Sequence, residues 1–226
     1  MKNLIVQIFI PKKGWEEEER LDFQNNEVLF LSTNLVYYYA KKYDCDYMLI
    51  NKASINFKHP TWERFALFDD NFTKKYNNIL YLDTDVFAWL DSPNIFNFID
   101  NKKFNVVRHI AKKKWMNSDA FNAGVFCIND KSVKMMKPFI SKEIWIKNFI
   151  KDPLWEDSKE LNTLAQITNV EINWLDEMWN MKNDPNSYFT HLWGKQKKIN
   201  PEMPAIQKAR QLLLTKKPVF NITDFS

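Results

Sequence analysis

Ile79-Leu80-Tyr81-Leu82-Asp83-Thr84-Asp85-Val86 carries the strongest structural signal in the chain. Its opening apolar residues predict a buried strand, and Asp83 and Asp85 follow that strand directly. Residues two apart in an extended segment point the same way, so both carboxylates can face one metal ion. Ligands of open α/β sheets bind beyond the carboxyl ends of the strands. The segment therefore predicts a site for Mg²⁺ or Mn²⁺ at that edge of an α/β sheet, with a solvated turn as the alternative.

A second pair of aspartates has the same spacing but a different position. Asp44 and Asp46 precede the apolar run Tyr47-Met48-Leu49-Ile50, so they lie at the amino end of a predicted strand. That end belongs to the opposite edge of a parallel sheet from the one that binds ligands. Position rather than spacing therefore favours Asp83 and Asp85 as metal ligands.

The segments around Asp83 predict a single domain with a mostly parallel central sheet flanked by helices. Strands are expected over 4–10, 47–50, 79–82, 104–109 and 121–128, and helices over 34–43, 61–76, 133–150 and 158–168. The alternation of strand and helix before Asp83 is typical of parallel sheets. The 226 residues show no internal repeat and no linker, so we expect one domain over 1–226, with a tail over 199–226.

Composition excludes several classes of protein. Hydrophobic residues make up 45% of the chain and charged residues 27%, as in soluble globular proteins. No run of 18 apolar residues is present, so we expect no transmembrane segment. The net charge of +4 comes mainly from scattered lysine clusters, which predict solvated faces and no nucleic-acid partner. Two cysteines, Cys45 and Cys127, fit a reducing compartment.

The three glycines, Gly14, Gly124 and Gly194, are too few and too scattered for a phosphate-binding loop. A Walker A loop needs two glycines with a lysine at fixed spacing, and a dinucleotide fingerprint needs three close together. Any bound nucleotide would therefore need a metal ion and lysines to hold its phosphates.

Two later segments carry residues that suit such a ligand. His191-Leu192-Trp193-Gly194-Lys195-Gln196-Lys197 combines an imidazole, which favours Mn²⁺ over Mg²⁺, with lysines that can contact phosphate. Phe121-Asn122-Ala123-Gly124-Val125 places the Asn122 amide, which can bind sugar hydroxyls, beside a glycine in a predicted strand.

Taken together, these segments resemble glycosyltransferases of the GT-A fold, the nucleotide-diphospho-sugar transferases. They are most similar to glycogenin-like and bacterial lipooligosaccharide galactosyltransferases. Two further segments, 39–47 and Trp62-Glu63-Arg64, are similar to fungal-type galactosyltransferases and to glycosyltransferases of large DNA viruses. The motifs follow the family's order over 4–198.

The resemblance implies transfer of a hexose from a UDP-sugar donor to a glycan, glycoprotein or lipid acceptor. Mn²⁺, or Mg²⁺, would be held by Asp83, Asp85 and His191. Asn122 would contact the donor sugar as a catalytic-site residue. The residues expected around the nucleotide are Lys197, Lys195, Gly194, Arg64, Asp83, Phe9 and Ile10. Together with the cysteine usage, the resemblance implies a cytoplasmic protein, in the host cytoplasm for a viral one.

Asp157 is the second candidate catalytic residue, since Asp157 and Asn162 match a family motif. It would orient acceptor or sugar, or act as a base in an inverting reaction. A plain helix-terminal carboxylate is the alternative. The glycogenin-like motifs imply transfer with retention of the anomeric configuration. Ser158, which stands where the family often has glutamine, weakens that implication.

Two other functions stay open at this stage. A phosphatase of the haloacid dehalogenase type would use Asp83 as nucleophile and Asp85 as general acid, but its motif usually lies near the N-terminus. A catalytically silent protein that binds sugar nucleotides is the other alternative.

Overall fold

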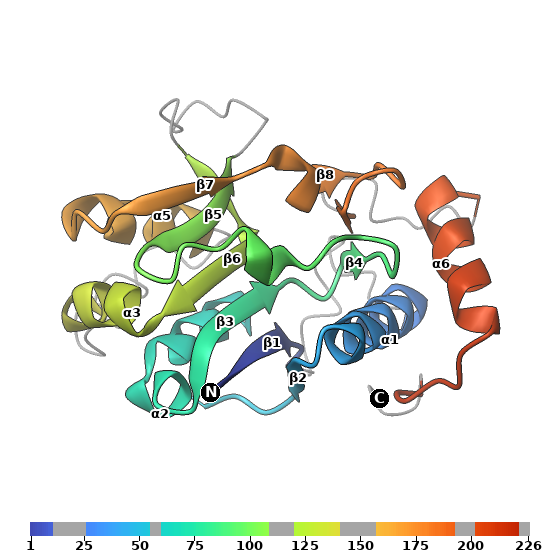
Figure 1. The fold of residues 1–226 in the computed structure, drawn as a ribbon, viewed down its shortest axis with the longest axis horizontal. Helices are drawn as coiled ribbons and strands as arrows, with labels where there is room; N and C mark the ends of the chain where they lie inside the picture. The colour runs from blue at the N-terminus through green and yellow to red at the C-terminus, as the bar shows by residue number, and fades with distance from the viewer. Residues whose placement is uncertain (11–25, 55–59, 109–119, 141–156, 193–201, 222–226) are drawn as a thin grey trace, which may run out of the picture.

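The computed structural model describes residues 1–10, 26–54, 60–108, 120–140, 157–192 and 202–221 (Figure 1). Its centre is a six-stranded sheet with the strand order β2-β1-β3-β6-β5-β7. These strands are β1 (Lys2–Ile8), β2 (Asp46–Ile50), β3 (Tyr76–Leu82), β5 (Phe104–Arg108), β6 (Phe121–Asn129) and β7 (Ile172–Leu175). The pairs β1–β2, β1–β3 and β5–β7 are parallel, so the predicted α/β fold with a mostly parallel sheet is confirmed.

The direction of the strands defines where a ligand could bind. Only β6 of this sheet runs antiparallel to its neighbours, β3 and β5. All the other strands of the sheet therefore end at one edge, here called the carboxyl edge, and β6 begins there. Asp83 follows β3 at this edge, as expected for a ligand site of an open α/β sheet.

Both faces of the sheet are covered, because alternate residues of its strands are apolar on each side. On one face, α1 (Asn26–Lys42) packs Val36, Tyr39 and Ala40 against Ile5 and Leu80. The other face is covered by η1 (Pro60–Phe68), α2 (Asp70–Thr73), α3 (Asp130–Met136) and α5 (Asp157–Ile167). Aromatic side chains from η1 and β6 fill much of that second core.

A second, three-stranded sheet lies beside the carboxyl edge. It has the order β4-β9-β8 and consists of β4 (Val86–Ala88), β9 (Phe189–His191) and β8 (Met181–Lys182). β4 and β9 are antiparallel, with Val86 opposite His191. Chain segments more than 100 residues apart in sequence are thus joined directly after β3. Two short turns of 3₁₀ helix, η2 (Ile95–Asn97) and η4 (Glu177–Trp179), connect to these strands, and α6 (Pro204–Leu214) packs on α1 (Figure 1).

Several expected boundaries were wrong, for physical reasons. The helix expected over 34–43 begins at Asn26, since Leu31 and Leu35 bury against α6 and the small sheet. The helix expected over 61–76 is instead the 3₁₀ segment η1 followed by the short α2. The strand expected over 79–82 begins earlier, at Tyr76, and includes Asn78, whose amide donates to Asn3 Oδ1 and Asn101 Oδ1.

The helix expected over 133–150 is also shorter. α3 begins at Asp130 with a capping box between Asn129 and Ser132, and passes into η3 (Lys137–Phe139) at Pro138. Proline removes a backbone donor and disturbs an α-helix. Residues 141–150 of the expected helix lie outside the described residues.

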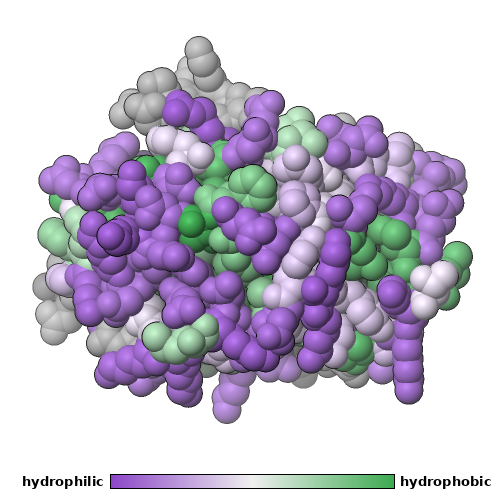
Figure 2. Space-filling model, viewed as in Figure 1, coloured by the Kyte–Doolittle hydropathy of each residue, from purple (hydrophilic) through white to green (hydrophobic). Residues whose placement is uncertain are grey.

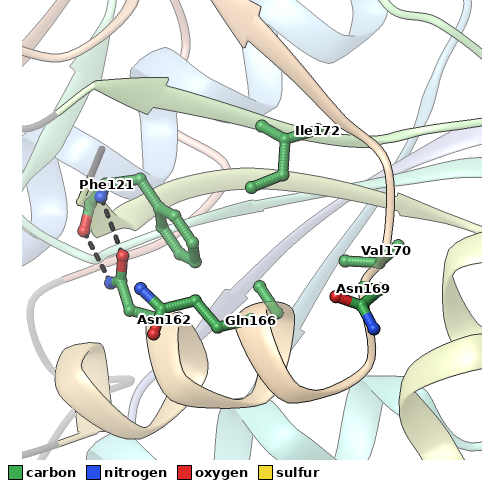
Figure 3. A pocket seen from close by; sticks show the side chains of 7 residues that line it. Phe121, Asn162, Gln166, Asn169, Val170 and Ile172 are labelled. Carbon is green, nitrogen blue, oxygen red and sulfur yellow. Dashed lines mark hydrogen bonds between the residues drawn. The ribbon is translucent and has the colours of Figure 1, made fainter. Parts of the chain in front are cut away.

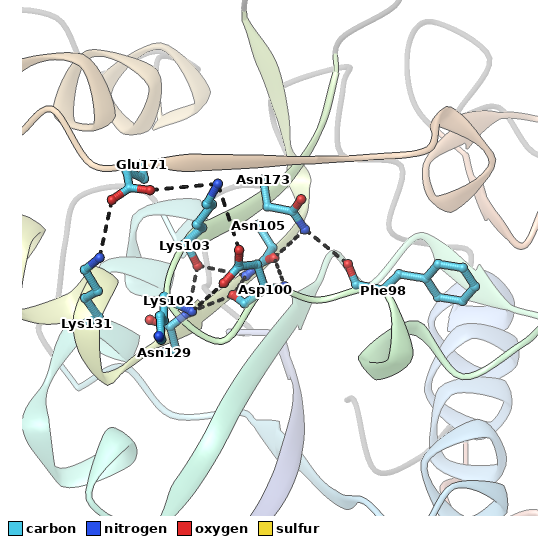
Figure 4. A network of polar contacts seen from close by, with 9 residues as sticks. All are labelled: Phe98, Asp100, Lys102, Lys103, Asn105, Asn129, Lys131, Glu171 and Asn173. Carbon is cyan, nitrogen blue, oxygen red and sulfur yellow. Dashed lines mark hydrogen bonds and ion pairs between the residues drawn. The ribbon is translucent and has the colours of Figure 1, made fainter.

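A polar network holds the opposite, amino edge of the sheet (Figure 4). The fully buried Asn105 accepts from Asp100 N and donates to the backbone oxygens of Asp100 and Lys103. Asn129 also donates to Lys103 O. These bonds satisfy buried polar groups and make the network structural. On the face in Figure 2 hydrophilic side chains predominate, and no helix among the described residues is long and apolar enough to cross a membrane.

Candidate metal centre

Asp83 and Asp85 lie on a tight turn between two buried strands. Val86 N donates to Asp83 O at 3.0 Å, which closes the turn between the end of β3 and the start of β4. Asp83 N donates to Gly124 O at 2.9 Å and so ties the turn to β6. The two aspartate side chains are 25% and 19% exposed, which leaves them accessible to a ligand.

His191 completes a group of three potential metal ligands. Its Nε2 lies 3.1 Å from Asp85 Oδ1 and 3.7 Å from Asp83 Oδ2. One ligand atom from each residue lies within 4.8 Å of the others, so the three could hold one ion. Leu192 N also donates to Asp85 O at 2.9 Å, which fixes β9 to the turn. The structure thus brings together three residues of which two, Asp83 and His191, lie 108 positions apart in the sequence.

The other oxygen of Asp83 is held by neighbouring side chains. Its Oδ1 accepts from Arg64 Nη2 at 3.0 Å and from Tyr81 Oη at 2.6 Å. Arg64 is nearly buried, donates to Ala123 O and Thr61 O, and lies over the Tyr81 ring at 4.8 Å. Asp83 is therefore oriented with Oδ2 toward His191. These contacts make Arg64 a support of Asp83, and its expected contact with a nucleotide stays a prediction.

Gly124 lies against the imidazole ring of His191, and the absence of a Cβ at this position leaves space for the ring. A Cβ built on Gly124 would lie 2.2 Å from His191 Cε1 and 2.9 Å from Asn122 Oδ1. Real Cβ atoms do not approach other atoms this closely, so any larger residue would displace the ring. Asn122 Oδ1 accepts from Gly124 N at 2.7 Å, which places the Asn122 side chain next to the centre. The glycine that the sequence put inside a strand is thus explained by close approach of a side chain.

Asn162 connects the second predicted motif to this edge. Its amide accepts from Phe121 N at 2.9 Å and donates to Phe121 O at 3.0 Å (Figure 3). It also donates to Ser158 O, so the start of α5 is held against the start of β6. Asp157 is the first residue of α5, so its backbone lies at the carboxyl edge. A pocket of about 390 Å³ beside Asn162 is lined by Gln166 and Ile172 and by none of the three potential ligands.

The remaining expected residues are only partly described. Phe9 and Ile10 follow β1 at the carboxyl edge and are half-buried, with Phe9 N donating to Ile50 O. The side chain of Asp157 and all of Gly194, Lys195 and Lys197 lie outside the described residues.

The comparison pair Asp44 and Asp46 lies where the sequence placed it. Asp46 is the first residue of β2, at the amino edge. Lys2 Nζ lies 3.1 Å from Asp44 Oδ1 and 3.7 Å from Asp46 Oδ1. The predicted difference between the two Asp-x-Asp segments is confirmed, since only Asp83 and Asp85 follow a strand.

The sequence did not predict two buried residues that hydrogen-bond to members of the centre, Gln7 to Asp83 O and Asn180 to His191 Nδ1. Gln7 lies fully buried in β1, and Asn180 lies buried after η4 with its Oδ1 2.8 Å from His191 Nδ1. For Gln7 a signal existed, because it is the single polar residue in an otherwise apolar strand segment over 4–10. Asn180 carries no such signal, since it lies outside the strands and its partner His191 belongs to a separate element, β9.

No protein-family model and no curated protein sequence matches this chain. Several solved structures, however, are similar to this chain. One is a glycosyltransferase involved in glycosylation of the major capsid of the virus PBCV-1, with TM-score 0.61, 14% identity, and coverage of 93% of this chain and 100% of that one. Another is the galactosyltransferase LgtC in complex with donor and acceptor sugar analogues, with TM-score 0.61, 16% identity, and coverage of 96% and 98%.

A third similar structure is a Drosophila β1,4-galactosyltransferase 7 in complex with manganese, UDP-Gal and xylobiose. Its TM-score is 0.52 at 10% identity, and the match covers 99% of this chain and 84% of that one. At these identities the likeness shows the fold, and the fold expected from the sequence resemblance is confirmed.

Proposed function

We propose that this chain, which has the GT-A fold of the glycosyltransferases, is a metal-dependent glycosyltransferase. It would move a hexose from a UDP-sugar to a glycan, glycoprotein or lipid acceptor. The observation that carries the proposal is the convergence of Asp83, Asp85 and His191 at the carboxyl edge of this fold. The complex of a similar enzyme with manganese and UDP-Gal supports the choice of ion and donor class.

The three residues fit a divalent cation. Two carboxylate oxygens and an imidazole nitrogen suit Mn²⁺ better than Mg²⁺, which prefers oxygen ligands alone. An unprotonated Nε2 at 3.1 Å from Asp85 Oδ1 would face lone pair to lone pair, and a cation between them removes that repulsion. When bound, such an ion supplies a Lewis acid for the diphosphate leaving group.

The chain's own residues would bind and orient the substrate. Asn122, whose Oδ1 accepts from Gly124 N, would contact donor-sugar hydroxyls. Asp157, at the start of α5, would orient sugar or acceptor, and Lys197 would contact the diphosphate. Transfer would retain the anomeric configuration, as the glycogenin-like motifs imply, although Ser158 replaces the family's glutamine. Analysis of the product's anomeric configuration tests this.

The phosphatase alternative fits the structure less well. A nucleophilic Asp83 needs an oxygen that can approach a phosphorus atom. Asp83 Oδ1 instead accepts from both Arg64 and Tyr81, and Oδ2 faces His191. This arrangement suits a metal ligand rather than a carboxylate that forms a covalent intermediate.

Calorimetric titration of UDP tests the proposal. With Mn²⁺ present, UDP should bind the wild-type protein, and EDTA or Asp85→Asn should abolish binding. Asp46→Asn is the matched control, because it removes the same group at the amino edge and should leave binding unchanged. A screen of UDP-sugars for slow hydrolysis would then identify the donor. Failure of UDP to bind under all conditions would overturn the proposal.

A further inference from the structure

We propose that Asn180 is a positioning residue that holds the proton of His191 on Nδ1 and so presents Nε2 to the metal ion. The inference rests on the proposed metal-dependent function and deepens it. Asn180 lies on the side of the imidazole ring away from the two aspartates, and nothing in the sequence pattern marked it.

The contacts of the ring define two different sides. Nδ1 lies 2.8 Å from Asn180 Oδ1, whereas Nε2 lies 3.1 Å from Asp85 Oδ1 and 3.7 Å from Asp83 Oδ2. The His191 side chain is 4% exposed and Asn180 is 6% exposed, so water competes little for either contact. Each ring nitrogen therefore has a fixed protein environment.

Hydrogen-bond chemistry then determines the tautomer. A carbonyl oxygen accepts and cannot donate, so the short contact with Asn180 Oδ1 requires a proton on Nδ1. A neutral imidazole has one N–H, which leaves the Nε2 lone pair directed at the carboxylates. Partners of this kind fix the orientation and tautomer of histidine ligands in metal sites.

Without Asn180 the opposite tautomer would be favoured in the metal-free protein. Asp85 Oδ1 would attract the ring proton to Nε2, where it would form a hydrogen bond at the observed 3.1 Å. A metal ion would then have to displace that proton before it could bind. Asn180 opposes this competition, and removing it should weaken metal binding without removing any ligand.

The backbone holds Asn180 in place independently of the metal. Asn180 N donates to Glu177 O at 2.9 Å, and the preceding Trp179 is buried against Phe189 with ring centroids 5.0 Å apart. The next strand, β8, pairs in parallel with β9, with Lys182 opposite His191. The ring also lies directly against the backbone of Gly124 in β6, where a Cβ would be 2.2 Å from Cε1.

Metal affinity in a double-mutant cycle tests the inference. Asn180→Leu keeps the size but removes the acceptor, and it should lower Mn²⁺ affinity about 10-fold or more, the usual cost of losing such a partner. Asn180→Asp keeps an acceptor and should retain the wild-type affinity. In a His191→Ala background, Asn180→Leu should cost nothing further. An equal loss in both backgrounds would show a general structural role and overturn the inference.

Nitrogen chemical shifts of His191 in the metal-free protein give a readout that needs neither activity nor a variant. In the neutral form of the ring, which the two nitrogen shifts distinguish from the imidazolium, Nδ1 should carry the proton and Nε2 should carry none. An unprotonated Nδ1 would mean that the amide donates to the ring, and the inference would fail. If wild-type protein binds Mn²⁺ and Asn180→Leu binds it equally well, the inference fails alone; if wild-type protein binds no Mn²⁺, the proposed function fails first.

Discussion

Gln7 Nε2 lies 3.1 Å from the backbone oxygen of Asp83, and this contact joins the interior of β1 to the turn of the candidate metal centre. The same nitrogen donates to Ser32 Oγ at 2.9 Å, and Ser32 Oγ donates to Val86 O at 2.7 Å. Tyr47 Oη completes the group by donating to Gln7 Oε1 at 2.9 Å. Both ends of the turn are thus held from the core.

Gln7→Leu should destabilise the protein and weaken metal binding together. Leucine has nearly the same size but leaves Ser32 and Tyr47 without their buried partner, which costs about 1–3 kcal/mol. The turn would also lose the hydrogen bond that Gln7 donates to Asp83 O, so Mn²⁺ affinity should fall. Urea unfolding and Mn²⁺ titration measure the two effects. Gln207→Leu is the matched control, since Gln207 is exposed, bonds Glu202 and should change neither quantity.

Gly124→Ala should lower Mn²⁺ affinity by displacing His191. The added methyl group would lie 2.2 Å from Cε1 and 2.8 Å from Nδ1 of the ring, and Nδ1 is also the atom that contacts Asn180 Oδ1. Overpacking of this kind typically costs about 1–3 kcal/mol of stability. The loss in stability should be largely relieved in a His191→Ala background, where the ring is absent. A similar loss in both backgrounds would place the strain elsewhere.

The sequence predicted the candidate metal ligands, which the structure brings together, better than the elements that bring them together. Asp83 and Asp85 were identifiable because their position after a strand is a local feature. The approach of His191 depends on β4 and β9, which are only three residues each and have no periodicity long enough to recognise. The supports supplied by Gln7 and Asn180 are contacts between separate elements, and such contacts leave no spacing pattern in a single sequence.

Cys45 should react slowly with thiol reagents and should make stability fall at alkaline pH. Burial, reinforced by the charges of Asp44 and Asp46, raises the pKa of its thiol from 9.0 to about 11. At about pH 8 the thiolate fraction is therefore about a hundredfold below that of an unfolded chain. As the pH rises, the thiol of the unfolded chain loses its proton before the thiol of the folded protein does. The contribution of Cys45 to the free energy of unfolding is therefore complete below pH 9 and is lost as the pH rises toward 11. The difference between wild type and Cys45→Ala in unfolding experiments over this range isolates the effect.

Arg64→Lys keeps the positive charge but should still strongly lower both stability and Mn²⁺ affinity. Within the described part of the chain, the guanidinium donates from three different nitrogens to Thr61 O, Ala123 O and Asp83 Oδ1, and the side chain is only 4% exposed. A lysine ammonium is a single point and cannot reproduce this fork. Removing one partner of a buried ion pair lowers the free energy of unfolding by about 3–5 kcal/mol. Lysine, which restores only part of the contacts of Arg64, should still cost a substantial part of that.

Arg210→Lys is the control for that substitution. Arg210 also contacts a carboxylate through two nitrogens, at 2.6 Å and 3.0 Å from Glu27, but its side chain is 42% exposed. Solvent screens exposed pairs, so this change should leave unfolding and Mn²⁺ binding nearly unchanged. Arg64→Lys should lower both, because Asp83 loses the contact that turns Oδ2 toward His191. Equal behaviour of the two variants would mean that burial of Arg64 does not support the metal centre.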